Sequence, residues 1–297
     1  MTNWVQAIRQ KTVLYSEFVK LEHTLFALPF ALSAMVLASR AWPDPATVFW
    51  VIVAMVGGRT YAMGVNRIAD AALDAQNPRT KDRPLPSGRM DEGEAWTLML
   101  SGLLVLILAV TFLPPICFAL LPVAWWILTM YSFTKRFSYL SHAVLGLALG
   151  ASAIGGWLAV GGQWSWVAVL FGLAVLFWVA GFDIIYACLD TRFDREVGLQ
   201  SVPARFGIPT ALLISRLCHG AALLFLVLTG WQVVGHLSGM YWLAVLLTTM
   251  MLIYEHQLVK ESDLSRVNEA FFAVNGLISM AMFLMIILDR ILLLWRS

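Results

Sequence analysis

Long runs of apolar residues make up most of the chain, and short polar segments separate them. A helix that crosses a bilayer needs about 20 consecutive, mostly apolar residues. Nine stretches meet this requirement: Leu21–Ser39, Ala46–Val65, Ala95–Leu113, Ile116–Phe133, Leu140–Val160, Trp164–Leu189, Ile208–Gly230, Leu237–Leu258 and Ala270–Leu294. The pattern therefore predicts an all-α integral membrane protein with nine transmembrane helices.

The composition supports this class of protein. Hydrophobic residues account for 60% of the 297 residues and charged residues for only 13%, whereas about 25% of the residues of a soluble domain are charged. These values exclude an ordinary soluble enzyme and a disordered chain. Three cysteines without paired spacing indicate neither a disulfide framework nor a zinc site. A net charge of +2 is too small to indicate nucleic-acid binding.

The basic residues are distributed unevenly between the two sides of the predicted membrane region. Seventeen of the 20 lysines and arginines lie on one side: 15 lie before the first helix or in loops that follow even-numbered helices, and Arg59 and Arg216 lie in helices near those loops. Because positively charged loops stay on the cytoplasmic side, we expect the N-terminus and these loops to face the cytoplasm. The protein is thus predicted to cross the cytoplasmic (inner) membrane several times, in contact with membrane lipid.

Two loops on the cytoplasmic side are longer than the other connections. Asn66–Glu94 follows the second helix and Asp190–Gly207 follows the sixth, so both can face one pocket. An offset of 120 residues aligns three pairs of polar residues: Asn66 with Tyr186, Asp70 with Asp190, and Asp74 with Asp194. This alignment indicates a four-plus-four helix pseudo-repeat, to which the ninth helix is added.

Each of these two regions carries a stripe of acidic residues at helical spacing. The first stripe consists of Asn66, Asp70 and Asp74, and the second of Asp183, Tyr186, Asp190 and Asp194. Residues four apart share one face of a helix, and stacked carboxylates repel unless a cation lies between them. Their hard oxygen donors suit Mg²⁺, which also bridges to substrate phosphates. The alternative is that they are solvated charges on helix ends, and two such stripes on the same side disfavour it.

Basic residues follow the first stripe closely. Arg79, Lys81 and Arg83 lie within five residues of one another, and Pro84 and Pro86 stiffen the loop behind them. Arginine side chains match phosphate oxygens two at a time. Basic loops beside transmembrane helices can also bind anionic lipid, but the interleaved aspartates disfavour that alternative. Carboxylates, a divalent cation and arginines together indicate a diphosphate site.

Three segments resemble a known family. The segments NRIADAALD and NPRTKDRPLPSG resemble the first signature of the UbiA superfamily of intramembrane aromatic prenyltransferases, and DIIYACLDTRFDREVGLQSVPARFG resembles the second. The segment YSFTKRF is similar to the 4-hydroxybenzoate polyprenyltransferase branch. The resemblance covers essentially the whole chain, and it implies one domain over residues 1–297 with nine helices around a central cavity.

The resemblance implies a Mg²⁺-dependent reaction in which a polyprenyl diphosphate ionises and its allylic carbon attacks an aromatic ring. The implied metal ligands are Asn66, Asp70 and Asp74 for one Mg²⁺ and Asp190 and Asp194 for a second. The implied diphosphate-binding residues are Arg79, Lys81, Arg83 and Lys135. Arg67 stands where many members carry Asp, which leaves the ligand set of the first Mg²⁺ open.

Two further residues are implied to act near the aromatic acid, Asp183 and Arg136. Asp183 lies within a predicted span, where it can orient the acceptor or take up the proton that the ring loses. Arg136 can bind the carboxylate of the acceptor, although a basic residue in a cytoplasmic loop also fits the charge bias alone. We assign no chemistry to the five histidines.

Three functions remain in competition. The first is a 4-hydroxybenzoate polyprenyltransferase of ubiquinone biosynthesis, which joins the prenyl group to the carbon ortho to the hydroxyl. The second applies the same chemistry to a naphthoic-acid-type acceptor in menaquinone biosynthesis by the futalosine route, because HTLFALPF resembles members of that route. The third is an ion-coupled transporter, which the position of the acids at helix ends disfavours. No obligate protein partner is indicated.

Overall fold

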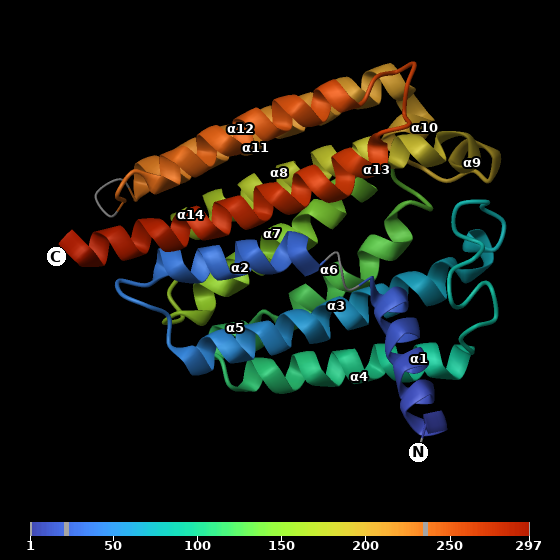
Figure 1. The fold of residues 1–297 in the computed structure, drawn as a ribbon, viewed down its shortest axis with the longest axis horizontal. Helices are drawn as coiled ribbons and strands as arrows, with labels where there is room; N and C mark the ends of the chain where they lie inside the picture. Colours follow the sequence, from blue (N-terminus) through green and yellow to red (C-terminus); the bar gives the residue numbers. More distant parts are fainter. Residues whose placement is uncertain (1, 21–23, 234–236, 297) are drawn as a thin grey trace.

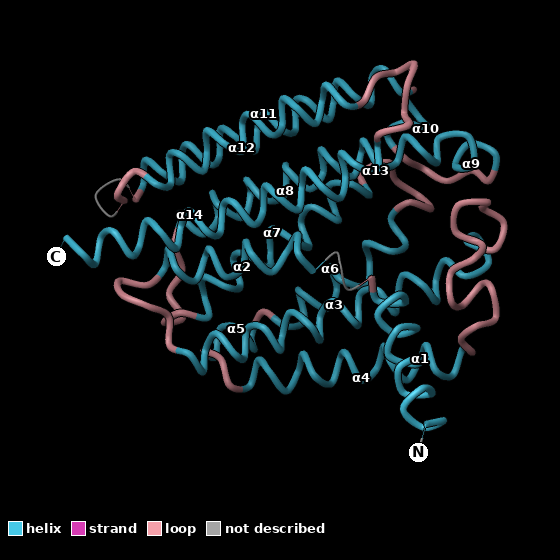
Figure 2. The backbone as a smooth tube through the Cα atoms, in the orientation of Figure 1, coloured by secondary structure: helices cyan, strands magenta, loops and turns pink. Residues whose placement is uncertain are grey.

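The computed structural model describes residues 2–20, 24–233 and 237–296. Their regular structure is helical, apart from an isolated bridge between Lys260 and Asp263 (Figure 2). Six helical segments among these residues are long and apolar enough to cross a membrane: Pro45–Asp74, Glu92–Thr111, Ser141–Ala159, Trp166–Glu196, Ile208–Gln232 and Val267–Trp295. The chain is therefore an all-helical, multi-pass integral membrane protein.

Every predicted stretch contains a helix or a pair of helices. The principal helices are α2 (Thr24–Ala38), α3 (Pro45–Asp74), α4 (Glu92–Thr111), α5 (Pro115–Ala119), α6 (Leu121–Thr134), α7 (Ser141–Ala159), α8 (Trp166–Ala187), α11 (Ile208–Gln232), α12 (Met240–Leu258) and α14 (Asn275–Arg296). The first predicted stretch begins with residues 21–23, which lie outside the described residues. The fourth stretch is divided between α5 and α6, because Pro122 interrupts the hydrogen bonding of a continuous helix.

The second predicted span is longer in the structure than the apolar pattern indicated. Helix α3 continues to Asp74, nine residues beyond Val65, so the first acidic stripe belongs to the same helix as the span. The predicted loop Asn66–Glu94 is correspondingly shorter, since only residues 75–91 connect α3 with α4. Asp44 begins α3 by accepting a hydrogen bond from the amide of Thr47 at 2.9 Å, and Pro45 occupies the first turn.

The segment after α8 is also more regular than the predicted loop Asp190–Gly207. It contains a 3₁₀ turn (Cys188–Asp190), α9 (Thr191–Glu196) and α10 (Val202–Phe206). This segment and residues 75–91 lie at the same end of the helix bundle, whereas the C-terminus lies at the opposite end (Figure 1). The first and the second motif, which are the segments that resemble the two UbiA signatures, meet at the end that carries residues 75–91. Helix α1 (Thr2–Val19) runs across the direction of the long helices near the same end.

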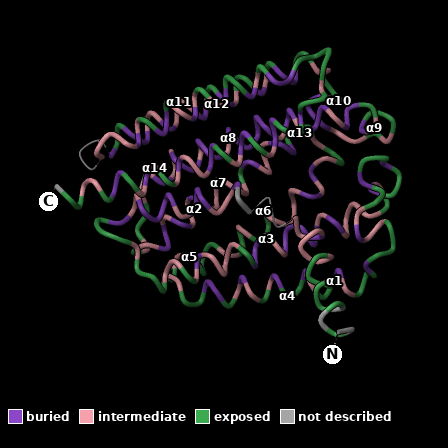
Figure 3. Tube along the Cα trace, in the orientation of Figure 1, coloured by how far each residue is buried: buried purple, intermediate pink, exposed green. Residues whose placement is uncertain are grey.

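Glycines allow neighbouring helices to approach closely. A Cβ atom on Gly57 of α3 would lie 2.6 Å from the Leu106 nitrogen of α4, and one on Gly146 of α7 would lie 2.3 Å from the Leu176 oxygen of α8. Small residues at such crossings are typical of membrane helices. Buried and exposed positions alternate along α4 and α11 (Figure 3), and large apolar side chains such as Leu104 and Leu217 are exposed. These outward faces fit contact with lipid.

Candidate active site

A cavity of about 600 Å³ opens at the end of the bundle that carries the two motifs. Helices α3, α6, α7 and α8 contribute to its wall, together with residues 75–91 and the segment after α8. Ten of the eleven predicted site residues line it: Asn66, Asp70, Asp74, Arg79, Arg83, Lys135, Arg136, Asp183, Asp190 and Asp194. The exception is Lys81, which is exposed and does not contribute to the lining. A direct contact between Lys81 and a ligand in the cavity is therefore not supported.

The first stripe faces this cavity from α3. The amide nitrogen of Asn66 donates a hydrogen bond to Asp70 Oδ2 at 2.9 Å, and Arg136 Nη2 donates to Asp70 Oδ1 at 3.1 Å. Arg83 Nη1 donates to both carboxylate oxygens of Asp74, at 2.8 and 2.7 Å. Both aspartates of this stripe are therefore paired with an arginine.

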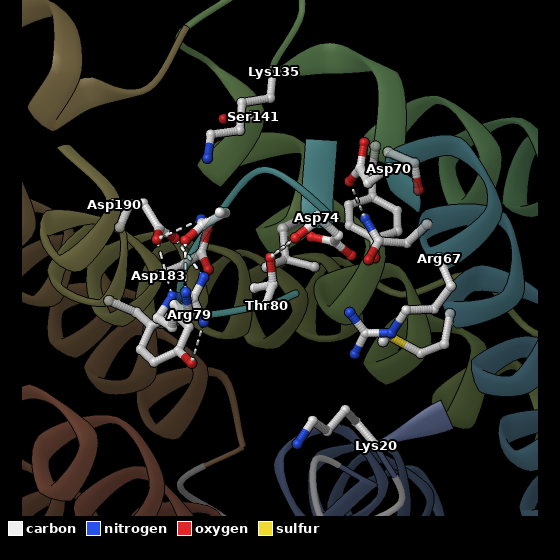
Figure 4. Close-up of a pocket in the computed structure, with 18 of the residues that line it drawn as sticks. Lys20, Arg67, Asp70, Asp74, Arg79, Thr80, Lys135, Ser141, Asp183 and Asp190 are labelled. Carbon is white, nitrogen blue, oxygen red and sulfur yellow. Dashed lines mark hydrogen bonds and ion pairs between the residues drawn. The ribbon is translucent and has the colours of Figure 1, made fainter. Parts of the chain in front are cut away.

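The second stripe meets the first across the cavity. Arg79, from the connection after α3, binds Asp190 with two nitrogens: Nε lies 2.9 Å from Oδ1 and Nη2 lies 2.5 Å from Oδ2. Asn77 adds a third hydrogen bond to Asp190, at 3.1 Å. Figure 4 shows Asp70, Asp74 and Asp190 around one space, with Arg79 against Asp190. The expectation that both motifs share one cavity is confirmed by these contacts.

Asp194 completes the acidic set and is almost fully buried. Lys135 Nζ lies 2.8 Å from its Oδ1, and the hydroxyl of Ser201 donates to its Oδ2 at 2.7 Å. The backbone fixes this arrangement further, because the amide of Gln200 donates to the carbonyl oxygen of Lys135 at 2.6 Å. The end of α6 is thereby held against the second motif.

The donor set fits Mg²⁺ in kind. Within the described ranges, no three acidic, histidine or cysteine side chains converge closely enough to hold a metal ion by themselves. Mg²⁺ does not need such a cage, because it is commonly held by one or two carboxylates, waters and substrate phosphates. Carboxylates on two sides of one cavity, with basic side chains between them, match that mode of binding.

Arg79 remains a cation in these surroundings. Burial lowers the pKa of its guanidinium, but the hydrogen bonds and the charge of Asp190 outweigh burial and raise the pKa above its ordinary value. Arg79 Nη1 also donates to the Tyr186 hydroxyl at 3.1 Å, and the guanidinium lies 5.2 Å from the centre of the Tyr186 ring. A fixed positive charge therefore stands at the boundary between the polar rim and the apolar wall.

The apolar wall is aromatic. Tyr186 stacks on Phe271 with ring centres 4.1 Å apart, and Phe271 packs edge-on against Phe26 and Phe182 at 5.5 and 5.2 Å. Phe271 lies in a π-helical turn, Ala270–Val274, that precedes α14. All four aromatic residues line the cavity. The sequence pattern singled out Tyr186 by its place in the second stripe but not the three phenylalanines, because aromatic residues are common throughout the chain and no spacing distinguishes these three.

Arg67 makes a backbone contact and, in the part of the chain that the structure describes, is not paired with an aspartate of the first stripe. It is buried with 3% of its surface exposed, and its Nε donates to the carbonyl oxygen of Phe18 at 3.3 Å. Arg67 therefore connects α3 to the end of α1. It supplies no oxygen donor, so the first stripe offers Asn66, Asp70 and Asp74 alone.

Asp183 lies beside a residue to which sequence reasoning gave no role. His142 Nδ1, from the first turn of α7, is 2.6 Å from Asp183 Oδ2, and both residues line the cavity. A histidine near the end of an apolar stretch carries no distinguishing pattern, so only the approach of α7 to α8 reveals the pair. The cavity thus combines a charged rim, an aromatic wall and a carboxylate held by an imidazole.

Comparison with known proteins connects this arrangement to a family. The sequence profile of the UbiA prenyltransferase family matches residues 27–286. The chain is 31% identical over 260 residues to a 4-hydroxybenzoate octaprenyltransferase from Francisella tularensis subsp. novicida, covering 88% of this chain and 90% of the relative. It is 30% identical over 275 residues to a protein of the same name from Methylobacillus flagellatus, covering 91% and 92%.

Solved structures share the fold. A UbiA homolog from Aeropyrum pernix K1 is 34% identical, with a TM-score of 0.81 over 90% of this chain and 98% of that chain. A UbiA homolog from Archaeoglobus fulgidus, solved with DMAPP and Mg²⁺, is 18% identical, with a TM-score of 0.74 over 93% and 98%.

Proposed function

The chain belongs to the UbiA prenyltransferase family, and on this premise we propose that it transfers a polyprenyl group from polyprenyl diphosphate to 4-hydroxybenzoate. The new bond forms at the ring carbon ortho to the hydroxyl, as ubiquinone biosynthesis requires. The observation that carries the proposal is the contact between Arg79 and Asp190, which joins the two motifs at the rim of an aromatic-walled cavity. The names of the relatives at about 30% identity support the choice of acceptor.

Nine membrane spans around this cavity, in a four-plus-four pseudo-repeat with a ninth helix, complete the proposed architecture as a single domain. Its support is that each predicted stretch contains a helix and that the paired stripes face each other. We place the protein in the cytoplasmic membrane with the cavity facing the cytoplasm, because the loops at that end carry most of the basic residues.

The basic residues of the rim would bind the diphosphate. Arg79 and Arg83 line the cavity from the connection after α3 and Lys135 lines it from the end of α6, and arginine forks suit phosphate oxygens. Asn66, Asp70 and Asp74 would hold one Mg²⁺, and Asp190 and Asp194 a second. When bound, Mg²⁺ supplies positive charge that stabilises the oxygens of the departing diphosphate.

Prenyl transfer breaks the bond between the allylic carbon and the diphosphate oxygen, and the diphosphate leaves with the electron pair. The ring carbon ortho to the hydroxyl then forms a bond with the allylic carbon, and the ring loses a proton, which Asp183 takes up. The faces of Tyr186 and Phe271 stabilise positive charge on the prenyl group. The apolar wall keeps water away from that charge. Arg136, at the rim, binds the carboxylate of the acceptor.

A naphthoic-acid-type acceptor is the second candidate, and one observation favours it. Phe26 belongs to the stretch that resembles menaquinone-route members, and it lines the cavity in contact with Phe271. His23, at the start of that stretch, lies outside the described residues. The transporter alternative is not retained, because the chain belongs to a family of transferases.

The test uses the full-length protein in detergent with Mg²⁺, geranyl diphosphate and a radiolabelled acceptor. We expect a prenylated acid from 4-hydroxybenzoate, and no product after the metal is chelated. Product from the naphthoic acid derivative alone would reject 4-hydroxybenzoate and support the second candidate. No product from either acceptor would reject the proposed function.

A further inference from the structure

His142 is held on both sides of its ring at the back of the cavity. Only 4% of its surface is exposed. Nδ1 lies 2.6 Å from Asp183 Oδ2, and the backbone amide of Val202 donates a longer hydrogen bond to Nε2 at 3.4 Å. The ring therefore connects α8, which carries Asp183, with α10 of the second motif.

The two partners fix where the proton of the neutral ring lies. A backbone amide can only donate, so Nε2 must be the acceptor and must be without a proton. The proton of the neutral imidazole is then on Nδ1, from which it is donated to Asp183. Because both nitrogens are engaged, the ring has no further group to which it could pass a proton. Its geometry is that of a support and not of a relay.

The Asp183 carboxylate has one oxygen, Oδ1, available to a ligand in the cavity. Among the described residues, Asp183 Oδ2 is bound by His142 and no hydrogen bond is made to Oδ1. The Asp183 side chain is 23% exposed, whereas that of His142 is 5% exposed and lies behind it. Asp183 lines the same cavity as Asp190 and Arg79 (Figure 4).

The segment that binds His142 also binds Asp194, on the proposed diphosphate side of the cavity. Val202 follows Ser201, whose hydroxyl donates to Asp194 Oδ2 at 2.7 Å and accepts from the amide of Ala204 at 3.3 Å. One short segment at the start of α10 therefore holds both His142 and the carboxylate of Asp194. The spacing between the acceptor side and the diphosphate side depends on this segment.

We propose that His142 is a positioning residue for prenyl transfer, which orients Asp183 so that Oδ1 meets the hydroxyl-bearing aromatic acceptor at a fixed distance from the diphosphate site. This role rests on the proposed function, since it needs an aromatic acceptor beside Asp183. An error of about 1 Å in the placement of a reacting group can cost about a hundredfold in rate. Loss of the support should therefore lower kcat and leave the KM for the prenyl diphosphate nearly unchanged.

Two substitutions of His142 by amide side chains of different length distinguish a positioning role from a packing role. In His142→Asn, the amide nitrogen takes nearly the place of Nδ1 and can still donate to Asp183. In His142→Gln, the amide extends toward the place of Nε2, so the support of Asp183 is lost at a similar side-chain volume. We expect kcat to fall by about threefold at most in His142→Asn, and by about tenfold or more in His142→Gln and His142→Ala. His256→Gln, outside the cavity, is the matched control and should behave like the wild type.

A double-mutant comparison makes the test independent of general damage. In an Asp183→Asn background, His142→Gln should cause less than about a twofold further loss, because the group that it positions is already altered. Equal activities of the Asn and Gln variants, or losses that multiply in the double variant, would overturn the positioning role. A wild-type protein that prenylates neither acceptor would instead reject the proposed function, so the two failures are distinguishable. If His142→Gln does not fold, judged by size-exclusion chromatography, His142→Ala carries the same comparison.

Discussion

Charge at the cavity rim is balanced residue by residue. Four of the aspartates that line the cavity are each bound to a different basic side chain; the pairs are Asp70–Arg136, Asp74–Arg83, Asp190–Arg79 and Asp194–Lys135. A metal-bound diphosphate offers phosphate oxygens to the basic members and cations to the acidic members. Binding can therefore replace internal ion pairs by substrate contacts without leaving a buried charge unpaired, which would be costly.

Arg79 should be the most sensitive basic residue of the first motif. Arg79→Ala removes a two-nitrogen contact at the rim, and hydrogen bonds to charged groups contribute about 1.5–3 kcal/mol each. We expect the KM for geranyl diphosphate to rise at least about tenfold, with a smaller effect for Arg79→Lys, which keeps the charge but not the fork. Lys81→Ala, in the same connection but exposed, should change KM by less than about twofold. Equal effects at both positions would show that only the overall charge of the loop matters.

Asp190 should be required for the response to Mg²⁺. Asp190→Asn keeps the shape of the side chain and removes a charge that can hold the metal, so we expect activity to fall about a hundredfold or more. Activity measured as a function of Mg²⁺ concentration checks this, with thermal unfolding in detergent as the test of integrity. Asp263→Asn, in the exposed connection after α12, provides the control. A variant with full activity at ordinary Mg²⁺ would contradict the metal assignment.

Among the secondary-structure elements, α3 shows how much of the site was predictable from the sequence. Asn66, Asp70 and Asp74 recur every fourth residue, and this period alone placed them on one face of a helix. The apolar pattern ended that helix too early, at Val65, because it follows the membrane boundary and not the hydrogen bonding of the backbone. Which basic residue binds which aspartate had no local signal, since Arg79 and Asp190 are 111 residues apart.

The π-helical turn before α14 is another feature of the site that the sequence did not predict. It places Phe271 against Tyr186, although nothing in the segment AFFAV distinguishes a π turn from an α turn. Asn275, just after the turn, accepts a hydrogen bond from Trp178 of α8 at 2.8 Å and donates to Glu255 of α12 at 2.8 Å. The register of this wall is therefore fixed by contacts between helices, which no spacing within one helix encodes.

The packing of α7 on α8 gives a test of close helix approach. A Cβ on Gly146 would lie 2.3 Å from a backbone oxygen of α8, whereas a Cβ on Gly155 of the same helix would meet nothing within 4 Å. We expect Gly146→Ala to destabilise the protein by about 1–3 kcal/mol, because backbone cannot yield as a side chain can. Gly155→Ala should be neutral or stabilising by up to about 1 kcal/mol. Melting temperatures in detergent check the difference, and similar values for both variants would show that α7 is not held so closely.

The two ends of the molecule differ in charge and in chemistry. Both motifs and the cavity lie at one end, and the short connection between α7 and α8 lies at the other (Figure 1). A charged diphosphate made in the cytoplasm can reach the cavity only if the motif-bearing end faces that compartment. The orientation of the chain in the membrane is thus a requirement of the proposed function as well as a consequence of the charge bias.

Single cysteines at the two ends test this orientation in intact cells. Glu92, at the start of α4, and Gln163, between α7 and α8, are both exposed and lie at opposite ends of the bundle. In a background in which Cys117, Cys188 and Cys218 are replaced by alanine, we expect a membrane-impermeant maleimide to label Gln163→Cys directly. Glu92→Cys should be labelled only after permeabilisation, because its thiol faces the cytoplasm. The reverse pattern would place the cavity outside the cell, away from its substrates, and would contradict both the orientation and the supply of diphosphate on which catalysis depends.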